Sequence, residues 1–148
     1  MSDAQDRLRA WTVVDELVLE ICGMTKGLAP HGLEEMPAAL RDAAIKSAIR
    51  TTLAVQASAC DLGSSLRSAL GSLAELRYFL YLARRIGLID TRRYRAACLR
   101  HERAQRALRA LLTRDEASQG SVGREALAPA AIEPIPASFE PFEPRKEA

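Results

Sequence analysis

Arginine side chains, which bind phosphate, are concentrated in one stretch of this 148-residue chain. Residues 77–114 hold 11 arginines against Asp90 and Glu102, a net charge of +9, whereas the whole chain has a net charge of +2. Guanidinium groups bind phosphate oxygens in a rigid fork geometry, so this surface predicts contacts with RNA or DNA. If residues 91–114 form a helix, eight of these arginines lie on one side of it and on the flanks of that side. The expected nucleic-acid-binding residues are Arg92, Arg93, Arg95, Arg100, Arg103, Arg106, Arg109 and Arg114.

The same arginines have a second interpretation, a solvated helix surface in a chain from a GC-rich genome. Arg outnumbers Lys 18 to 3, which codon bias explains. Codon bias does not explain a charge of +9 in this stretch, and solvated helices usually mix both signs for i,i+4 pairing. We therefore favour nucleic-acid binding. Aromatic stacking partners are scarce on this surface, so contacts mostly to phosphate, with little sequence specificity, are expected.

Residues that could perform catalysis or bind a metal do not form a recognisable motif. The sequence has no P-loop, no nucleophile elbow, no HExxH and no Glu-x-x-His pair. His101 falls on an apolar helix face and is expected to be a buried, hydrogen-bonded histidine, while His31 lies in a loop. Three isolated cysteines without a CxxC pair are expected to be reduced thiols and small apolar helix residues: Cys22, Cys60 and Cys98. We expect a protein that is not an enzyme and has no metal or cofactor.

Four amphipathic segments must position the arginines. The apolar period predicts helices over residues 6–28, 37–60, 64–86 and 91–114, separated by Gly- and Pro-containing breaks or Asp caps. Helices of this length joined by short turns favour an all-α, antiparallel up-down four-helix bundle over residues 1–114. The residues that mark the period are Trp11, Val14, Val18, Ile21 and Leu28 in the first helix, Leu40, Ala44, Ile45, Ile49 and Leu53 in the second, and Tyr94, Cys98, His101, Gln105, Leu108 and Leu112 in the fourth.

The third segment is apolar on two opposite sides. Its core side carries Leu62, Leu66, Ala69, Leu73, Leu76, Leu80 and Ala83. A lone bundle cannot cover both faces of one of its own helices, so the second face predicts contact with another subunit. The alternatives are an exposed patch or a core widened by the C-terminal residues. The expected interface residues are Gly71, Glu75, Tyr78, Phe79, Leu82 and Ile86, with Ser68 and Ser72 nearby.

Residues 115–148 are acidic and hold five of the seven prolines, which predicts a flexible tail. Its apolar residues fit a short docking peptide, although a purely solubilising tail fits the composition equally well. The expected docking residues are Ile132, Ile135, Phe139 and Phe142. The N-terminus shows no secretory signal pattern and no apolar run is long enough to span a bilayer, so we expect a cytoplasmic protein.

Two sequence stretches resemble a known family. The run Ala69-Leu70-Gly71-Ser72-Leu73-Ala74-Glu75-Leu76, followed by Gly87-Leu88-Ile89-Asp90 and Tyr94, is similar to the four-helix-bundle proteins encoded in intervening sequences of bacterial 23S rRNA genes. Trp11 and the stretch Leu40-Arg41-Asp42-Ala43-Ala44-Ile45 fit the same pattern, so the resemblance covers about residues 8–113. The segment SAIRTTLAVQASACDLG departs from the pattern because it lacks the family's Pro, Asn and Glu.

The resemblance implies a homopentameric ring of four-helix bundles. It also implies a relationship to the accessory variability determinant of diversity-generating retroelements, a basic pentamer that binds nucleic acid and a reverse transcriptase. We therefore expect a basic, oligomeric, RNA- or DNA-binding protein that could assist a reverse transcriptase. The alternative is a protein-interaction scaffold whose tail docks a partner without nucleic acid.

Overall fold

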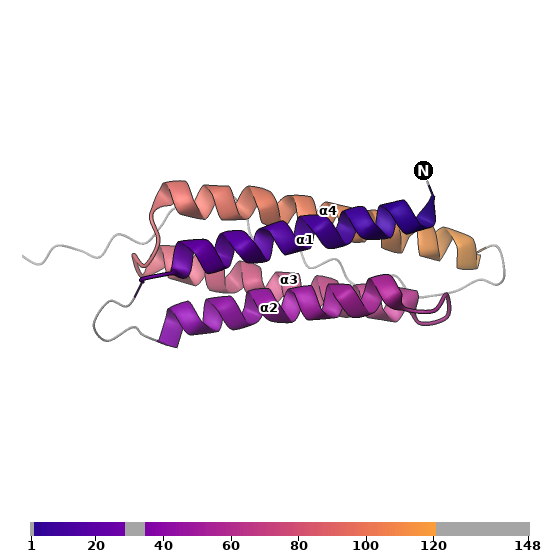
Figure 1. Ribbon diagram of the computed structural model, residues 1–148, viewed down its shortest axis with the longest axis horizontal. Helices are drawn as coiled ribbons and strands as arrows, with labels where there is room; N and C mark the ends of the chain where they lie inside the picture. Colours follow the sequence, from indigo (N-terminus) through magenta and orange to yellow (C-terminus); the bar gives the residue numbers. More distant parts are fainter. Residues whose placement is uncertain (1, 29–34, 121–148) are drawn as a thin grey trace, which may run out of the picture.

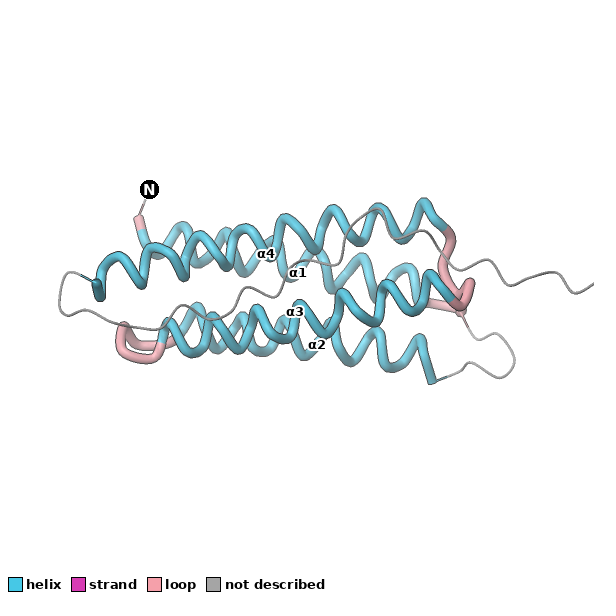
Figure 2. Tube along the Cα trace, turned by 180° about the vertical axis from the view of Figure 1, so that it is seen from behind, coloured by secondary structure: helices cyan, strands magenta, loops and turns pink. Residues whose placement is uncertain are grey.

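Four long helices form the structure, a computed structural model that describes residues 2–28 and 35–120 (Figure 1). They are α1 (Asp3–Thr25), α2 (Glu35–Gln56), α3 (Leu62–Arg85) and α4 (Thr91–Gly120). Each helix packs against two others, α1 and α3 both contacting α2 and α4, so the four surround one central core. No strand occurs in the described part of the chain (Figure 2). The predicted all-α four-helix bundle is confirmed.

The helix ends follow local sequence signals. Ser2 and Gln5 form a capping box at the start of α1. At the other end of the bundle, Gly87 adopts a φ of +78° and the Leu88 amide donates to the Ala83 carbonyl, which ends α3. Asp90 then begins α4, because its Oδ1 accepts a 2.8 Å hydrogen bond from the Arg93 amide. These signals hold α3 and α4 in a tight antiparallel pair.

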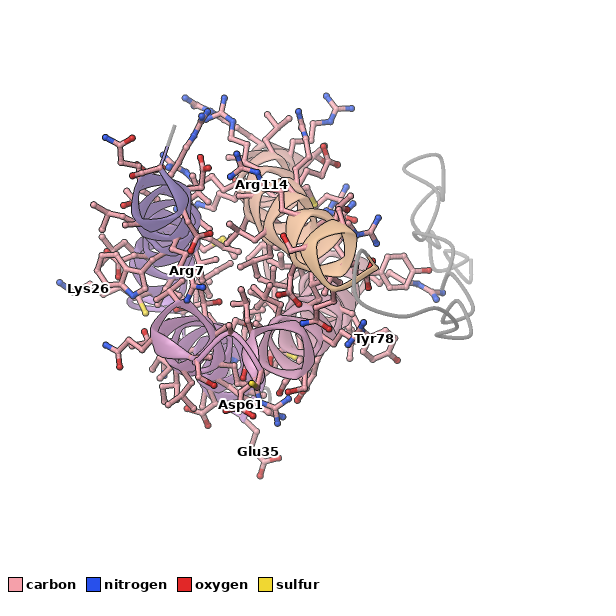
Figure 3. All side chains as sticks on the ribbon, turned by 90° about the vertical axis from the view of Figure 1, so that its right-hand side faces the viewer. Arg7, Lys26, Glu35, Asp61, Tyr78 and Arg114 are labelled. Carbon is pink, nitrogen blue, oxygen red and sulfur yellow. The ribbon has the colours of Figure 1, made fainter. Side chains whose placement is uncertain are left out.

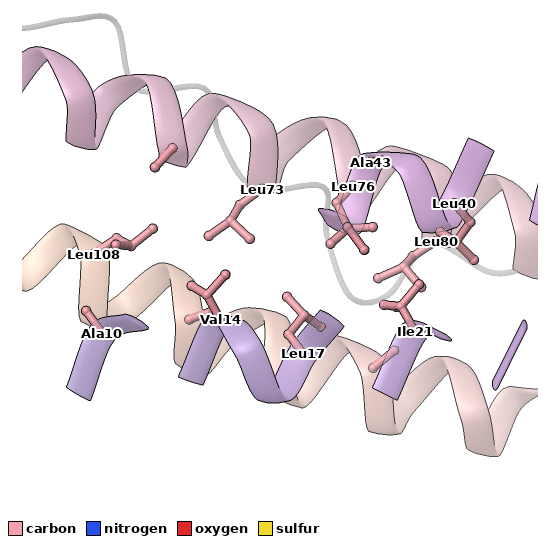
Figure 4. Close-up of a cluster of buried hydrophobic side chains, with 14 of the residues drawn as sticks. Ala10, Val14, Leu17, Ile21, Leu40, Ala43, Leu73, Leu76, Leu80 and Leu108 are labelled. Atoms are coloured by element: carbon pink, nitrogen blue, oxygen red, sulfur yellow. The ribbon is translucent and has the colours of Figure 1, made fainter. Parts of the chain in front are cut away.

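The core is a column of leucine and other aliphatic side chains between the four helices (Figure 4). The column includes Leu17 and Ile21 of α1, Leu40 of α2, Leu76 of α3 and Leu108 of α4, each of them 0 % exposed. The expected core side of α3 is confirmed, since all seven of its residues are buried. In α1 the core centres on Leu17, so that the buried residues are Ala10, Val14, Leu17, Ile21, Met24 and Thr25.

Helix α2 faces the core differently from what its apolar period indicates. Ser47 and Thr51 are 0 % exposed, whereas Ile45, Ile49 and Leu53 are 44 %, 56 % and 61 % exposed. The two hydroxyls donate to the carbonyls of the residues four positions earlier, at 2.9 and 2.8 Å. Intrahelical bonding satisfies these buried hydroxyls, and the three aliphatic residues are left as a stripe on the outer side of the helix.

Helix α4 is longer than expected. It continues through residues 115–120, which the sequence pattern placed in the flexible tail. Glu116 forms a 2.8 Å ion pair with Arg67 of α3, and the Gln119 amide donates to Asp115 at 3.0 Å. These contacts extend the helix by six residues beyond Arg114. Cys60 also differs from expectation, because it is exposed in the turn between α2 and α3 and not inside a helix.

None of the helices in the described ranges combines the length and the hydropathy that a membrane span requires.

Candidate nucleic-acid interface

Six of the eight predicted arginines of α4 are exposed and have no acidic partner. They make no ion pair with any residue in 2–28 or 35–120, although the Arg93 amide takes part in the cap of α4. Figure 3, which looks along the bundle axis, shows nitrogen-bearing side chains around the outer side of α4. The six are Arg92, Arg93, Arg95, Arg103, Arg106 and Arg109.

The remaining two arginines are neutralised by acidic residues of α1. The Arg100 guanidinium lies 3.1 Å from Glu20 and 3.6 Å from Glu16. Arg114 forms an ion pair with Asp6. The structure therefore divides the predicted site into two arginines that are paired with α1 and six that have no acidic partner among the described residues.

A groove of about 600 Å³ runs between α1 and α4. Arg9, Arg103 and Arg106 line it together with the carboxylates of Asp6 and Glu16. Both signs of charge are present in this groove, although its Arg103 and Arg106 are exposed and form no ion pair with a described residue.

On the other side, α3 extends the basic surface. The Arg84 guanidinium donates a 2.6 Å hydrogen bond to the Thr91 hydroxyl at the start of α4. Arg77 lies over the ring of Tyr94, 5.9 Å from its centroid, and Arg85 lies 5.6 Å from the centroid of Tyr81. Three arginines of the +9 stretch, Arg77, Arg84 and Arg85, are not among the residues predicted for the site. Their charge is evident from the sequence, and only the packing of α3 on α4 places them beside Arg95 of α4.

His101 is part of the core. It is 3 % exposed, and its Nε2 lies 2.6 Å from the carbonyl oxygen of Leu73 in α3. Burial lowers the pKa of His101 below its usual 6.5. The neutral ring donates from Nε2 to this carbonyl, which agrees with the expectation of a hydrogen-bonded core histidine. No group of three or more His, Cys, Asp or Glu side chains that could hold a metal occurs within 2–28 and 35–120.

The expected subunit face of α3 is partly exposed. Tyr78 and Ile86 are 53 % and 39 % exposed, while Phe79 and Leu82 are half-buried. A Cβ atom at Gly71 would have no neighbour within 4 Å, so the helix backbone is accessible there. Figure 3 shows Tyr78 directed away from the bundle.

Two polar residues of that face have partners within the chain. The carboxylate of Glu75 forms a 2.7 Å ion pair with Lys46 of α2. Ser72 is 1 % exposed and donates to the Ser68 carbonyl at 3.1 Å, so it belongs to the packed side of α3 and not to its outer face. The Lys46–Glu75 pair also places the exposed stripe of Ile45 and Ile49 on the helix that adjoins the α3 face.

The expected docking residues Ile132, Ile135, Phe139 and Phe142 lie outside the described residues. Comparison of the chain with protein families, with curated proteins and with solved structures gives no match. The assignment of function therefore depends on the geometry and charge of the bundle itself.

Proposed function

We propose that this protein is a non-catalytic, oligomeric, cytoplasmic protein that binds RNA or DNA through phosphate contacts with little sequence specificity. One observation carries the proposal: six exposed arginines of α4 have no acidic partner among the described residues, and one of them, Arg95, lines a pocket together with three further arginines of α3. Unpaired guanidinium groups at a surface bind phosphates and release condensed counterions, which is the main source of non-specific affinity for nucleic acid.

The chemistry of this surface explains the low specificity. Arginine forks on a convex helix contact phosphate oxygens, which are the same for every base sequence. Gln105 is the one amide side chain within residues 92–114, and it is half-buried. This stretch therefore has no exposed Asn or Gln that could form hydrogen bonds with base edges.

We further propose that the bundles assemble into a homopentameric ring through Gly71, Tyr78, Phe79, Leu82 and Ile86. The accessible backbone at Gly71 and the partly exposed aromatic and aliphatic side chains support this interface. A ring would repeat the arginine surface around its axis and raise the avidity for a long polyanion. The resemblance to the intervening-sequence proteins supports the pentamer and suggests a reverse transcriptase as a protein partner.

A salt-dependent binding measurement tests the function. Titrating a labelled single strand and a labelled duplex with the full chain, followed by fluorescence anisotropy at two salt concentrations, should give affinities that fall steeply with salt. Replacing Arg95, Arg103 and Arg106 by Glu should abolish binding. Circular dichroism and light scattering should show unchanged helicity and mass, because all three side chains are exposed and unpaired.

The second candidate is a protein-interaction scaffold that binds no nucleic acid. The exposed stripe of Ile45, Ile49 and Leu53 on α2 favours it, because surface aliphatic residues on one helix face are typical of docking sites. Absence of binding to single strands, duplex DNA and structured RNA at low salt would refute the nucleic-acid proposal and favour this one.

A further inference from the structure

A pocket of about 370 Å³ lies between α3 and α4, at the end of the bundle where Gly87 joins them. Its walls come from both helices: Tyr81 and Arg84 from α3, Tyr94 and Leu99 from α4. The volume is at the small end of the range for ligand sites, so the pocket has room for one small group and not for a helical duplex.

Arg77, which lines the pocket, has an unsatisfied hydrogen-bond donor. The Nη1 atom of Arg77 is buried and has no hydrogen-bond partner among the described residues. A buried guanidinium N–H without an acceptor is costly, so a shift of the Arg77 side chain toward an oxygen acceptor in the pocket is favourable. The ring of Tyr94, 5.9 Å from the Arg77 guanidinium carbon, holds the donor against the wall of the pocket.

The charge around the pocket selects an anion. Arg77, Arg84, Arg85 and Arg95 line it, and Glu102 is the one carboxylate among its described lining residues. Burial raises the pKa of both Tyr94 and Cys98, so these two groups remain neutral and do not offset the arginines. An anionic group such as a phosphodiester fits this positive field.

The remaining walls are apolar and aromatic. The Tyr81 ring lines the pocket, with the Arg85 guanidinium 5.6 Å from its centroid. Leu99 of α4 also lines the pocket and is 59 % exposed. A flat heteroaromatic ring stacks well on tyrosine faces and on guanidinium planes, whatever its identity. The pocket therefore combines an anion site with a stacking site, which together match one nucleotide.

We propose that the α3–α4 pocket holds one unpaired nucleotide of a single-stranded nucleic acid, its phosphate on Arg77, Arg84 and Arg95 and its base against Tyr81 and Leu99. This inference rests on the proposed nucleic-acid binding and makes its substrate single-stranded. In a duplex the bases are paired and stacked inside, so a duplex can contact the α4 arginines but cannot fill the pocket.

Three variants of the full chain separate the pocket from the arginine surface. Tyr81→Leu removes the stacking ring but keeps an apolar side chain, and it should raise the Kd for a labelled single strand about tenfold. It should leave the Kd for the matching duplex unchanged. Tyr81→Phe keeps the ring and should bind the single strand and the duplex with the same Kd values as the unsubstituted protein. Arg106→Gln, an exposed arginine of α4 outside the pocket, should weaken the single strand and the duplex alike.

Photocrosslinking provides a second measurement that does not depend on a substitution. A single strand containing 5-iodouridine, irradiated in the complex and mapped by mass spectrometry, should crosslink to Tyr81 or Tyr94. Thermal melts monitored by circular dichroism show whether the Tyr81 variants fold.

The outcomes distinguish the pocket from the wider function. Equal losses for single strand and duplex in folded Tyr81→Leu, or crosslinks confined to other parts of the bundle, would overturn the pocket while leaving nucleic-acid binding in place. A free nucleoside monophosphate that binds as tightly as the strand would also overturn it and assign the pocket to a mononucleotide. If neither the single strand nor the duplex binds at low salt, the proposed function and the pocket proposal are both wrong.

Discussion

Two pairs of arginines on α4 allow a sharp test because they carry the same charge but differ in their partners. Arg103 and Arg106 are exposed and unpaired, whereas Arg100 and Arg114 form ion pairs with Glu16, Glu20 and Asp6 of α1. Neutralising either pair by substitution with Gln removes two positive charges from one helix. Only the first pair is free to bind phosphate without breaking a contact within the protein.

The salt dependence of binding gives the magnitude. Each phosphate that the protein neutralises contributes about 0.7 to the slope of log K against log salt for a single strand and about 0.9 for a duplex. The double variant Arg103→Gln with Arg106→Gln should therefore reduce the slope by about 1.4 for a single strand and by about 1.8 for a duplex. Arg100→Gln with Arg114→Gln should change it by less than half as much, because these guanidiniums are already bound to carboxylates.

Anisotropy titrations between about 50 mM and about 200 mM salt measure both slopes on the same labelled oligonucleotide. Both double variants should remain folded, since exposed ion pairs contribute at most about 1 kcal/mol each to stability. Equal slope changes in the two variants would refute the distinction between paired and unpaired arginines of α4. No slope change in either variant would show that phosphates are not bound on this helix.

Three further predictions concern assembly, the C-terminal residues and pH. Leu82→Glu places a charge on the proposed subunit face and should reduce the mass measured by light scattering to that of a monomer while helicity is retained; a monodisperse monomer of the unsubstituted protein would contradict the ring. Deleting residues 121–148, which carry a net negative charge, should leave the melting temperature nearly unchanged and tighten nucleic-acid binding, and a truncated chain that does not fold would show that these residues are structural. Because burial lowers the pKa of His101 from 6.5, the unfolded chain takes up the proton first, and stability in urea melts should fall as the pH drops below 6.5. The loss should reach at most about 1.4 kcal/mol per pH unit and end at the folded-state pKa, whereas His101→Gln, which can still donate to the Leu73 carbonyl, should lack this component; an identical pH profile in both proteins would contradict the assignment.

Local sequence signals determined the number of helices and placed the end of α3 and the start of α4 within one residue. The turn between α3 and α4 shows why, because Gly87 and Asp90 act through hydrogen bonds to residues three to five positions away. The apolar periods of α3 and α4 also identified the correct core side of each helix. Helix α3 is rich in leucine, and α4 carries its arginines on the side opposite its apolar residues. Such short-range effects do not require knowledge of the partner helices.

The orientation of α2 was decided by tertiary packing. Its sequence offers two candidate faces, one with Ile45, Ile49 and Leu53 and one with alanines, Ser47 and Thr51. The structure buries the second face, where small side chains and self-satisfied hydroxyls fit between the large leucines of the neighbouring helices. Hydrophobicity alone favours the aliphatic residues, but the interior must be filled at uniform density, and the shape of the available space depends on the other three helices.

The division of the arginine surface depends on tertiary structure in the same way. The sequence by itself determined that α4 carries a dense, one-sided positive charge, because charge and helical period are both local properties. Which of these arginines are available to a ligand depends on Asp6, Glu16 and Glu20, more than 70 residues away in the chain, and on the arginines and tyrosines of α3. Coulombic pairing acts over a few ångströms in space regardless of sequence distance, so only the packing of α1 and α3 on α4 decides where the charge is neutralised and where a pocket forms.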